Sequence, residues 1–206
     1  MPISLRAELG RKSLHVLTAL VPLALLPLDR RLVLGLVALY AALAVAADVL
    51  RARSPAFSRF IRRWFGWMMR AEEHPDVTGP IVFNGATWVG LGALLLALAF
   101  PLRLAVPVFV AFMLADAAAA LVGRSLGRHH WPGTPRTLEG SLAFWIVATA
   151  VLAGLHALGS DVVAPSLLMS VGTGAAMSAA EALPGPLNDN LRVPFVGAVL
   201  LWLLVG

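Results

Sequence analysis

The sequence predicts an all-α protein, a polytopic bundle of about seven transmembrane helices. Of its 206 residues, 59% are hydrophobic and only 13% are charged, whereas a soluble domain carries about 25% charged residues. Mean hydropathy is +0.84. Seven long apolar runs follow one another, and a helix is the structure that pairs its own backbone polar groups in hydrocarbon. Seven spans of roughly 20 residues each would use about two-thirds of the chain, so we expect residues 1–206 to form a single integral membrane domain.

The apolar runs give the expected spans in chain order. The first run is short and is extended by the turn around Arg11, and the last reaches the chain end with 13 residues. A second run follows the first almost at once, which is typical of a multi-span protein rather than of a cleaved signal peptide. The expected spans are residues 13–28, 32–50, 81–100, 102–122, 141–158, 162–183 and 193–205.

The basic residues predict the orientation. If the N-terminus is cytoplasmic, 13 of the 16 Lys and Arg residues fall inside, and only Arg30, Arg31 and Arg103 fall outside. This is the bias of the positive-inside rule. It accounts for the net charge of +5 without a nucleic acid partner. Most acidic residues fall inside too, so we expect a multi-pass protein of the cell membrane with its functional residues at the cytoplasmic helix ends.

One segment outside the spans, about residues 55–70, has a different pattern. Phe57, Phe60 and Trp64 recur at helical spacing, and Arg59 and Arg63 fill other positions. This pattern predicts an amphipathic helix with an aromatic face. We expect the helix to lie in the membrane interface, where arginines meet anionic headgroups. A helix packed on the bundle is the alternative.

The N-terminal helix carries the first candidate site. Glu8, Arg11, Lys12 and His15 share one helix face. Three cationic or titratable groups beside a carboxylate can hold a phosphate. The alternative is a basic flank that only sets topology. His15 favours a function because it lies inside the apolar run, where a topology signal is not needed.

Asp116 is the second candidate. A carboxylate inside a spanning helix is costly and is therefore a functional hypothesis by default. Four alanines follow it, and small residues let neighbouring helices approach closely. Structural pairing of Asp116 with an arginine is the competing interpretation. Asp48 sits at a helix end, where we expect it to be solvated or paired.

The third candidate is the loop from residue 123 to residue 141. Its glycines allow backbone N–H groups to approach an anion, and its arginines can grip phosphate oxygens. A helix that begins after Gly140 would add its dipole. The P-loop motif is absent. The residues of this loop that we expect to contact phosphate are Gly123, Arg124, Gly127, Arg128, Arg136, Thr137 and Gly140.

The fourth candidate lies near the C-terminus. Glu181 is followed by Asn188, Asp189 and Asn190 at a membrane boundary. Their oxygens suit Mg²⁺, although the same residues also suit a turn or a helix cap. Four acids therefore lie among arginines at one membrane face: Asp116, Glu139, Glu181 and Asp189. A metal–nucleotide site requires this combination of acids for the cation and guanidinium groups for the phosphates.

These segments together resemble a known family. The sequences ELGRKSLH, ADAAAALVGRSLGR, TPRTLEGSLAFW and AAEALPGPLNDNLRVP are similar, in this order, to the dolichol kinase, phytol kinase and CTP-dependent diacylglycerol kinase family. The chain has Ala115 where the family usually has Gly, and Arg136 where it usually has Lys. The middle segment also resembles phosphatidate cytidylyltransferase, whose C-terminal signature is absent here.

The resemblance implies transfer of the CTP γ-phosphoryl group to the hydroxyl of a membrane-embedded alcohol, such as a polyprenol, a phytol-like prenol or diacylglycerol. The rival hypotheses are a cytidylyltransferase that makes CDP-diacylglycerol and a small transporter. The base that receives the alcohol proton stays open between Asp189 and His15. The expected catalytic residues are Asp116, Asp189, Glu139 and His15; the expected ligands of Mg²⁺ or another divalent cation are Asp116, Asp189 and Glu181; the expected phosphate or nucleotide contacts beyond the loop are Arg11, Lys12, Asn188 and Asn190.

Overall fold

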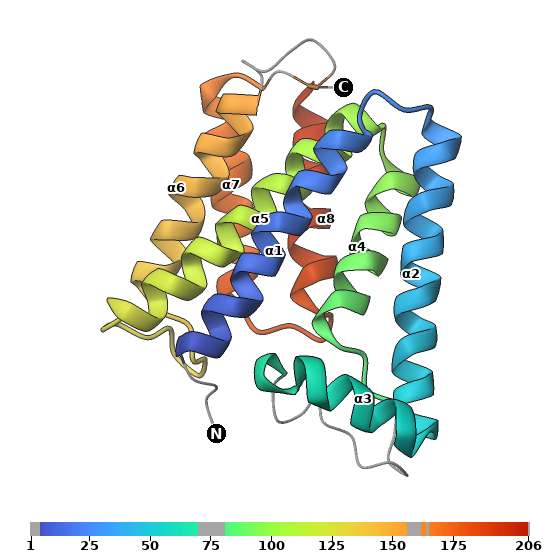
Figure 1. The fold of residues 1–206 in the computed structure, drawn as a ribbon. Helices are drawn as coiled ribbons and strands as arrows, with labels where there is room; N and C mark the ends of the chain where they lie inside the picture. The colour runs from blue at the N-terminus through green and yellow to red at the C-terminus, as the bar shows by residue number, and fades with distance from the viewer. Residues whose placement is uncertain (1–4, 70–80, 156–161, 164, 206) are drawn as a thin grey trace.

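The computed structural model describes residues 5–69, 81–155, 162–163 and 165–205, and in these residues it is all-helical, as predicted (Figure 1). The helices are α1 (Leu5–Leu25), α2 (Arg30–Arg53), α3 (Pro55–Phe65), the 3₁₀ turn η1 (Gly66–Met68), α4 (Gly85–Ala99), α5 (Leu102–Ser125), α6 (Leu138–Leu155), α7 (Leu167–Ala182) and α8 (Asp189–Val205).

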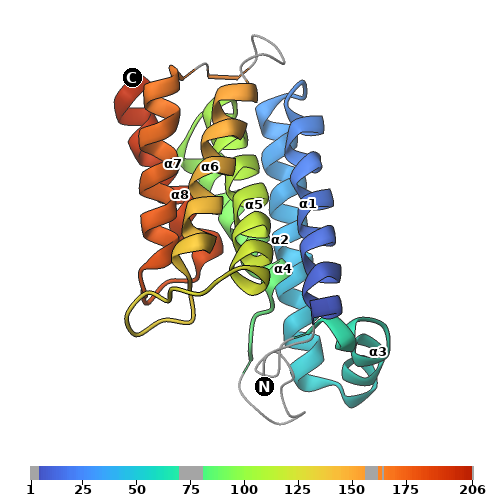
Figure 2. The ribbon, with the colours of Figure 1, turned by 90° about the vertical axis from the view of Figure 1, so that its left-hand side faces the viewer.

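The seven long helices run alternately up and down (Figures 1 and 2). The lower end of the bundle in Figure 1, named the polar end here, holds α3, the loop between α5 and α6 and the loop between α7 and α8. Arg30, Arg31 and Arg103 lie at the opposite end, where α2 and α5 begin. The other arginines whose side chains are described belong to the polar end: Arg51, Arg53, Arg59, Arg62, Arg63, Arg124, Arg128, Arg136 and Arg192.

Within the described residues, three helices are long and apolar enough to cross a membrane: α2, α5 and α6. The shorter apolar helices are α4 and the stretch Val16–Leu25 of α1. Each of the seven expected spans coincides with one helix of the bundle, while their crossing of a membrane and the orientation stay predictions. The outer surface is apolar, with large exposed side chains such as Leu43, Leu168 and Leu203. Such a surface is typical of contact with lipid or another protein.

Side-chain caps set several helix ends that the apolar runs alone misplaced. Asn84 accepts hydrogen bonds from the backbone N–H groups of Ala86 (2.7 Å) and Thr87 (3.1 Å). Therefore α4 begins at residue 85, not 81. Ser166 accepts from Met169 N–H (3.2 Å), so α7 begins at 167, not 162. These oxygens satisfy N–H groups that have no partner within the helix. The predicted end of the fifth run, residues 156–158, lies outside the described residues.

The core centres on α5, which packs against α1, α6 and α8. Nearly the whole first half of α5 is buried, and Val108, Ala111 and Met113 have no exposed surface. Further along, Ala115, Ala117 and Ala119 are also buried. These small side chains let α5 and its neighbours approach closely. This close contact brings the polar ends of α5, α6 and α8 together.

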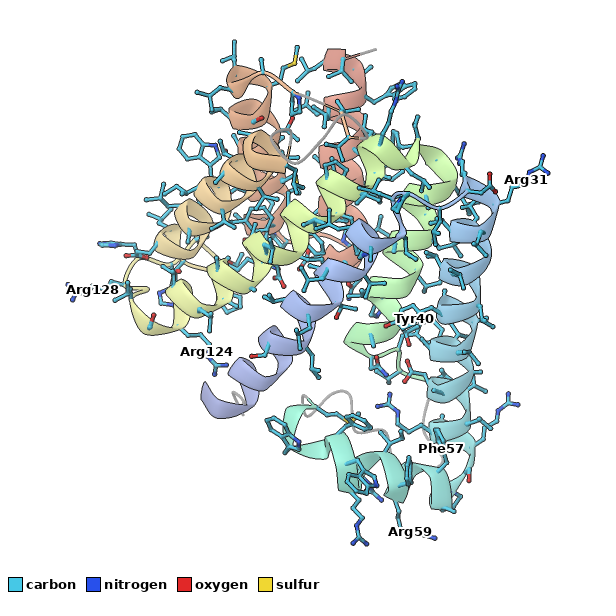
Figure 3. All side chains as sticks on the ribbon, turned by 45° about the horizontal axis from the view of Figure 1, so that its top comes forward. Arg31, Tyr40, Phe57, Arg59, Arg124 and Arg128 are labelled. Carbon is cyan, nitrogen blue, oxygen red and sulfur yellow. The ribbon has the colours of Figure 1, made fainter. Side chains whose placement is uncertain are left out.

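The predicted amphipathic segment forms α3 and η1, which lie across the polar end (Figure 1). Phe60, Trp64 and Trp67 are exposed, and Phe57 and Arg59 are visible in Figure 3. Ser58 is the buried residue of α3. The helix is thus amphipathic as predicted, and its place in a lipid interface stays a prediction.

Asp48 is paired and not solvated. Its carboxylate forms an ion pair with Arg51 (2.9 Å), and the two side chains are only 1% and 2% exposed. Asp48 also accepts hydrogen bonds from Thr87 Oγ1 (2.6 Å) and from Asn84 backbone N–H (2.9 Å). Arg51 donates to the carbonyl oxygen of Val82 (2.9 Å). This buried network joins the end of α2 to the start of α4 and has a structural role.

Candidate functional site

Arg136 connects two acidic residues that are far apart in the sequence. It lies just before α6, and its guanidinium group forms ion pairs with Glu181 near the end of α7 and with Asp189 at the start of α8. The Arg136 side chain is 28% exposed, and Glu181 is 11% exposed. An arginine with two carboxylates in a partly buried position is well oriented, because each contact is a charge-assisted hydrogen bond.

Arg192 completes this cluster and was not among the predicted site residues. It forms an ion pair with Asp189 (2.7 Å) and donates to the carbonyl oxygen of Leu183 (2.8 Å). Its guanidinium lies so close to Gly185 that a Cβ atom there would overlap it. The spacing of three residues between Asp189 and Arg192 on one helix was the signal in the sequence. The arginine–carboxylate cluster is therefore Arg136, Glu181, Asp189 and Arg192.

The cluster retains a hydrogen-bond donor for a ligand. Arg192 Nε is buried and has no hydrogen-bond partner among the described residues. Two guanidinium groups and two carboxylates balance in charge, so the cluster is neutral as it stands. An entering phosphate would compete with the carboxylates for the guanidinium groups, which bind phosphate oxygens in the same bidentate way.

The segment Asn188–Asn190 forms the helix cap that was one of the two uses foreseen for it. Asn188 caps α8, because its side-chain oxygen accepts the N–H of Asn190 (3.0 Å) and its carbonyl oxygen accepts the N–H of Arg192 (3.0 Å). The expected start of the last span at residue 193 was thus four residues late. The cap places Asp189 in the first turn, beside Arg136. The carbonyl group of Asn190 lies against Gly92 of α4, where a Cβ atom would overlap it.

The glycines of the predicted phosphate loop serve the contact between α5 and α6. Thr137 is 5% exposed, and its hydroxyl oxygen accepts the N–H of Gly140 (3.1 Å). A Cβ atom on Gly123 or Gly140 would lie 3.0 Å from this oxygen, and one on Gly127 would lie 2.6 Å from Thr137 Cγ2. In this structure Thr137 caps α6, and the three glycines lie close around it.

The same loop is folded back on itself below the ends of α6, α7 and α8 (yellow in Figure 2). The N–H of Trp131 donates to the carbonyl oxygen of Arg136 (2.9 Å), and the N–H of Leu138 donates to that of His129 (2.8 Å). His129 Nδ1 lies 2.7 Å from Glu139 Oε1. Glu139 therefore pairs with His129. The hydrogen bond between Trp131 and the backbone of Arg136 helps to hold Arg136 in place.

Three further predicted residues, Arg124, Arg128 and Asp116, lie outside the arginine–carboxylate cluster. Arg124, in the last turn of α5, and Arg128 in the loop are exposed (Figure 3). Asp116 is part-buried on α5, nine residues before the helix ends. Arg11 and Lys12 belong to the first half of α1, and their side chains, like those of Glu8 and His15, lie outside the described part of the chain.

The predicted metal ligands are only partly brought together. Glu181 and Asp189 meet at the Arg136 guanidinium, and two convergent carboxylates suit a divalent cation. No group of three or more His, Cys, Asp or Glu side chains converges among the described residues. The full trio with Asp116 is therefore not formed in this structure, and Glu181 and Asp189 are the pair that fits.

Comparison with known proteins gives the family. Over 177 residues the chain is 32% identical to CTP-dependent diacylglycerol kinase 1 of Schizosaccharomyces pombe. The matched segment covers 79% of this chain and 76% of that protein. Over 141 residues it is 26% identical to an uncharacterized protein of Rickettsia prowazekii, covering 68% of this chain and 67% of that protein. No family model and no solved structure matches the chain. The predicted resemblance is thus confirmed, and the chain belongs to the family of dolichol, phytol and CTP-dependent diacylglycerol kinases.

Proposed function

We propose that this protein is a CTP-dependent lipid kinase that phosphorylates the hydroxyl group of a membrane-embedded alcohol at the polar end of the bundle. One observation carries the proposal beyond family membership. Arg136 holds Glu181 and Asp189 together, so three distant segments supply cationic and anionic groups to one point. Phosphoryl transfer depends on positioning and on charge neutralisation, and both need such convergent charges.

The reaction breaks the bond between the γ-phosphorus and the oxygen that bridges it to the β-phosphate. A new bond joins the γ-phosphorus to the lipid oxygen, CDP leaves, and the alcohol proton passes to a base. Arg136 and Arg192 would bind phosphate oxygens, with Arg124, Arg128 and Lys12 as further cations. Guanidinium groups aimed at the transferring phosphoryl group stabilise the charge that develops on it.

The acidic residues receive the other roles. Asp189 is the proposed base, and His15 remains the second candidate. Glu181 and Asp189 are the residues that would hold Mg²⁺, which supplies further charge neutralisation at the phosphates. Asp116 is assigned to the same reaction because an acid within an apolar helix is costly to keep. Glu139 acts at a distance from the cluster, through its pairing with His129 (2.7 Å).

The bundle suits a reaction between a lipid and a soluble nucleotide. The apolar outer surface keeps the protein in the bilayer, and the polar end gathers most of the described arginines. We propose that all seven long helices span the membrane and that the polar end faces the cytoplasm, in agreement with the positive-inside rule. The nucleotide would then arrive from the cytosol, while the alcohol presents its hydroxyl group at the inner face.

Diacylglycerol is the first substrate to test, because it is the lipid named for the Schizosaccharomyces pombe relative. A polyprenol and a phytol-like prenol present the same hydroxyl group on an apolar body and remain alternatives. An apolar pocket distinguishes alkyl groups by only about 1–3 kcal/mol per methylene.

The test is a lipid phosphorylation assay with purified full-length protein. CTP labelled at the α or the γ position, and γ-labelled ATP in parallel, are incubated with diacylglycerol or prenol in mixed micelles, and the products are resolved by mass. We expect label in the lipid only from γ-labelled CTP. Label only from the α position would indicate a cytidylyltransferase and would overturn the kinase, and absence of transfer to every alcohol would also overturn it.

A further inference from the structure

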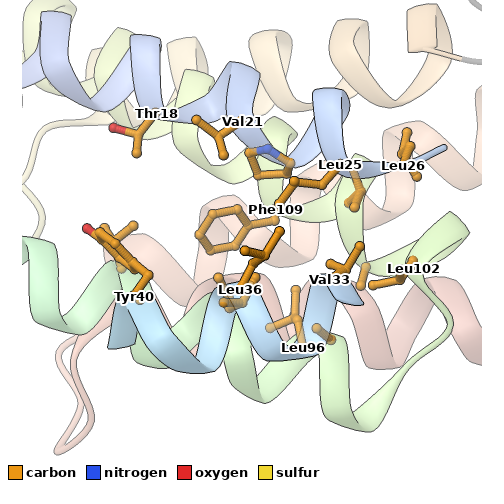
Figure 4. A pocket seen from close by; sticks show the side chains of 18 residues that line it. Thr18, Val21, Leu25, Leu26, Val33, Leu36, Tyr40, Leu96, Leu102 and Phe109 are labelled. Atoms are coloured by element: carbon orange, nitrogen blue, oxygen red, sulfur yellow. The ribbon is translucent and has the colours of Figure 1, made fainter. Parts of the chain in front are cut away.

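An apolar cavity lies between α1, α2, α4 and α5 (Figure 4). Its volume is about 360 Å³, within the range of roughly 300–1,000 Å³ that is typical of ligand sites. Val21 and Leu25 of α1, Leu36 of α2, Ala93 of α4 and Phe109 of α5 are among its lining residues. The phosphate chemistry described above uses none of these residues.

The cavity exists because α1 and α2 are packed on different partners. Helix α1 packs on α5 and α2 packs on α4, whereas α1 and α2 have almost no contact within the described part of the chain. The two helices diverge from their connecting turn toward the polar end (Figure 1). Val21 and Leu36 are half exposed, so the cavity opens between α1 and α2 onto the outer, apolar surface of the bundle.

The two ends of the cavity differ in chemistry. Leu25, Leu26 and Leu102 line the end near the turn between α1 and α2, and the hydroxyl groups of Thr18 and Tyr40 mark the other end (Figure 4). Tyr40 donates its hydroxyl hydrogen to the carbonyl oxygen of Ala86 (3.3 Å), and Thr18 donates to that of Leu14. The cavity is therefore apolar along its length and polar only at the end that faces the polar end of the bundle.

Asp116 lies on the same helix as a lining residue of the cavity. Phe109 lines the cavity, and Asp116 follows it by seven residues on α5, which places both residues on the same helix face. Seven residues of α-helix span about 10 Å, and α5 runs toward the polar end. Asp116 thus lies on the same face of α5 as Phe109, nearer the polar end of the bundle.

We infer that this cavity binds the hydrocarbon chain of the lipid alcohol substrate. The chain would enter between α1 and α2 from the bilayer and lie with its end toward Leu25 and Leu102. Its hydroxyl group would then lie at the polar end of the cavity, past Thr18 and Tyr40 and toward Asp116. The inference rests on the proposed function, and it adds where the substrate enters and which helices select its chain.

The first test compares two matched variants. Ala93→Phe fills the cavity, and Ala38→Phe places the same ring on the outer face of α2, because Ala38 is exposed and does not line the cavity. We expect Ala93→Phe to lower kcat/KM for dioleoylglycerol about tenfold or more, mainly through KM, and to spare dioctanoylglycerol, since an added ring excludes only the longer chain. We expect Ala38→Phe to match the wild type with both lipids.

The second test does not depend on catalysis. A diacylglycerol and a farnesol-type prenol, each with a photoreactive diazirine in the chain, are crosslinked to the protein, and the sites are mapped by mass spectrometry. We expect unlabelled alcohol to compete for crosslinks in Val21–Leu26 and Val33–Tyr40, and we expect both to disappear in Ala93→Phe and in the second filling variant, Val37→Trp.

The outcomes separate the cavity from the function. If both filling variants phosphorylate long-chain lipid as the wild type does, the cavity does not bind the substrate chain. The proposed kinase function would be unaffected by that result. Crosslinks that no alcohol displaces would identify a structural lipid and would also exclude substrate binding in the cavity. Competed crosslinks in a protein that phosphorylates no alcohol would keep the binding site and refute the kinase.

Discussion

Arg136 and Asp189 form an ion pair across 53 residues of sequence. This contact joins the loop before α6 to the first turn of α8, and Arg136 also reaches Glu181 of α7. Arg136 therefore links both acids, and Asp189 is held by Arg192 as well. Because the backbone of Arg136 is itself bonded to Trp131 (2.9 Å), the loop and the cluster form one structural unit.

The geometry of the Arg136 guanidinium, and not only its charge, should matter. Arg136→Ala is expected to lower kcat/KM for CTP about 100-fold or more, because it removes a guanidinium group that we propose contacts the transferring phosphoryl group. Arg136→Lys keeps the charge but cannot bridge two carboxylates in a fork, so we expect an intermediate loss. Steady-state transfer from γ-labelled CTP measures both variants. Full activity in Arg136→Ala would show that Arg136 is not part of the active site.

Asp116 and Asp189 are expected to be essential. Asp116→Asn and Asp189→Asn should each reduce kcat about 100-fold or more, as loss of a base or a charged ligand does. Asp29→Asn is the matched control, because Asp29 caps α2 at the opposite end of the bundle by accepting from Arg31 N–H (2.8 Å). All three variants should elute as the wild type does on size exclusion. Wild-type turnover in both site variants would refute the assignment.

Metal removal tests the proposed cation. Treatment with EDTA should abolish transfer, and added Mg²⁺ should restore it, because Glu181 and Asp189 meet at one point and their oxygens suit this ion. The Mg²⁺ concentration for half-maximal activity should rise in Glu181→Gln. Undiminished activity in excess EDTA would exclude the cation from the reaction.

The buried pair of Asp48 and Arg51 should control stability and not chemistry. Asp48→Ala leaves a guanidinium that is 2% exposed without its carboxylate, which costs about 3–5 kcal/mol. The double variant Asp48→Leu/Arg51→Met removes both charges, and it should recover most of that loss. Thermal unfolding in detergent measures the difference. A double variant less stable than Asp48→Ala would contradict this account.

Because α5 and α6 are in close contact, alanine substitutions at Gly140 and at Gly35 should change the melting temperature in opposite directions. A Cβ atom at Gly140 meets Thr137 Oγ1 and the Ala119 carbonyl oxygen at 3.0 Å, whereas one at Gly35 meets nothing within 4 Å. Gly140→Ala should therefore lower the melting temperature. Gly35→Ala should raise it slightly, because alanine in a helix interior is favoured over glycine by about 0.5–1 kcal/mol. Equal shifts in both variants would show that the contact is not tight.

Much of the fold follows from the sequence. Each of the seven apolar runs became one helix of the bundle, and the amphipathic segment near Phe57 became α3, because periodicity and hydropathy are local properties. Helix starts were less accurate where a cap lies inside an apolar run, as at Asn84 and Ser166. The loop glycines illustrate the harder case. The sequence identified Gly123 and Gly140, but their contact with Thr137 arises only when α5 and α6 pack together.

The sequence by itself determined the membrane character, the helical class and the family, since composition, apolar run length and motif order are all carried by the linear chain. Only the tertiary structure decided which charges meet. Arg136 forms ion pairs with Glu181 and Asp189, and Glu139 pairs with His129. Arg192, which was not predicted as a site residue, also belongs to the cluster. The reason is physical: an ion pair needs its two groups within a few ångströms, and the helices that bring them there are packed by apolar side chains far from the charges.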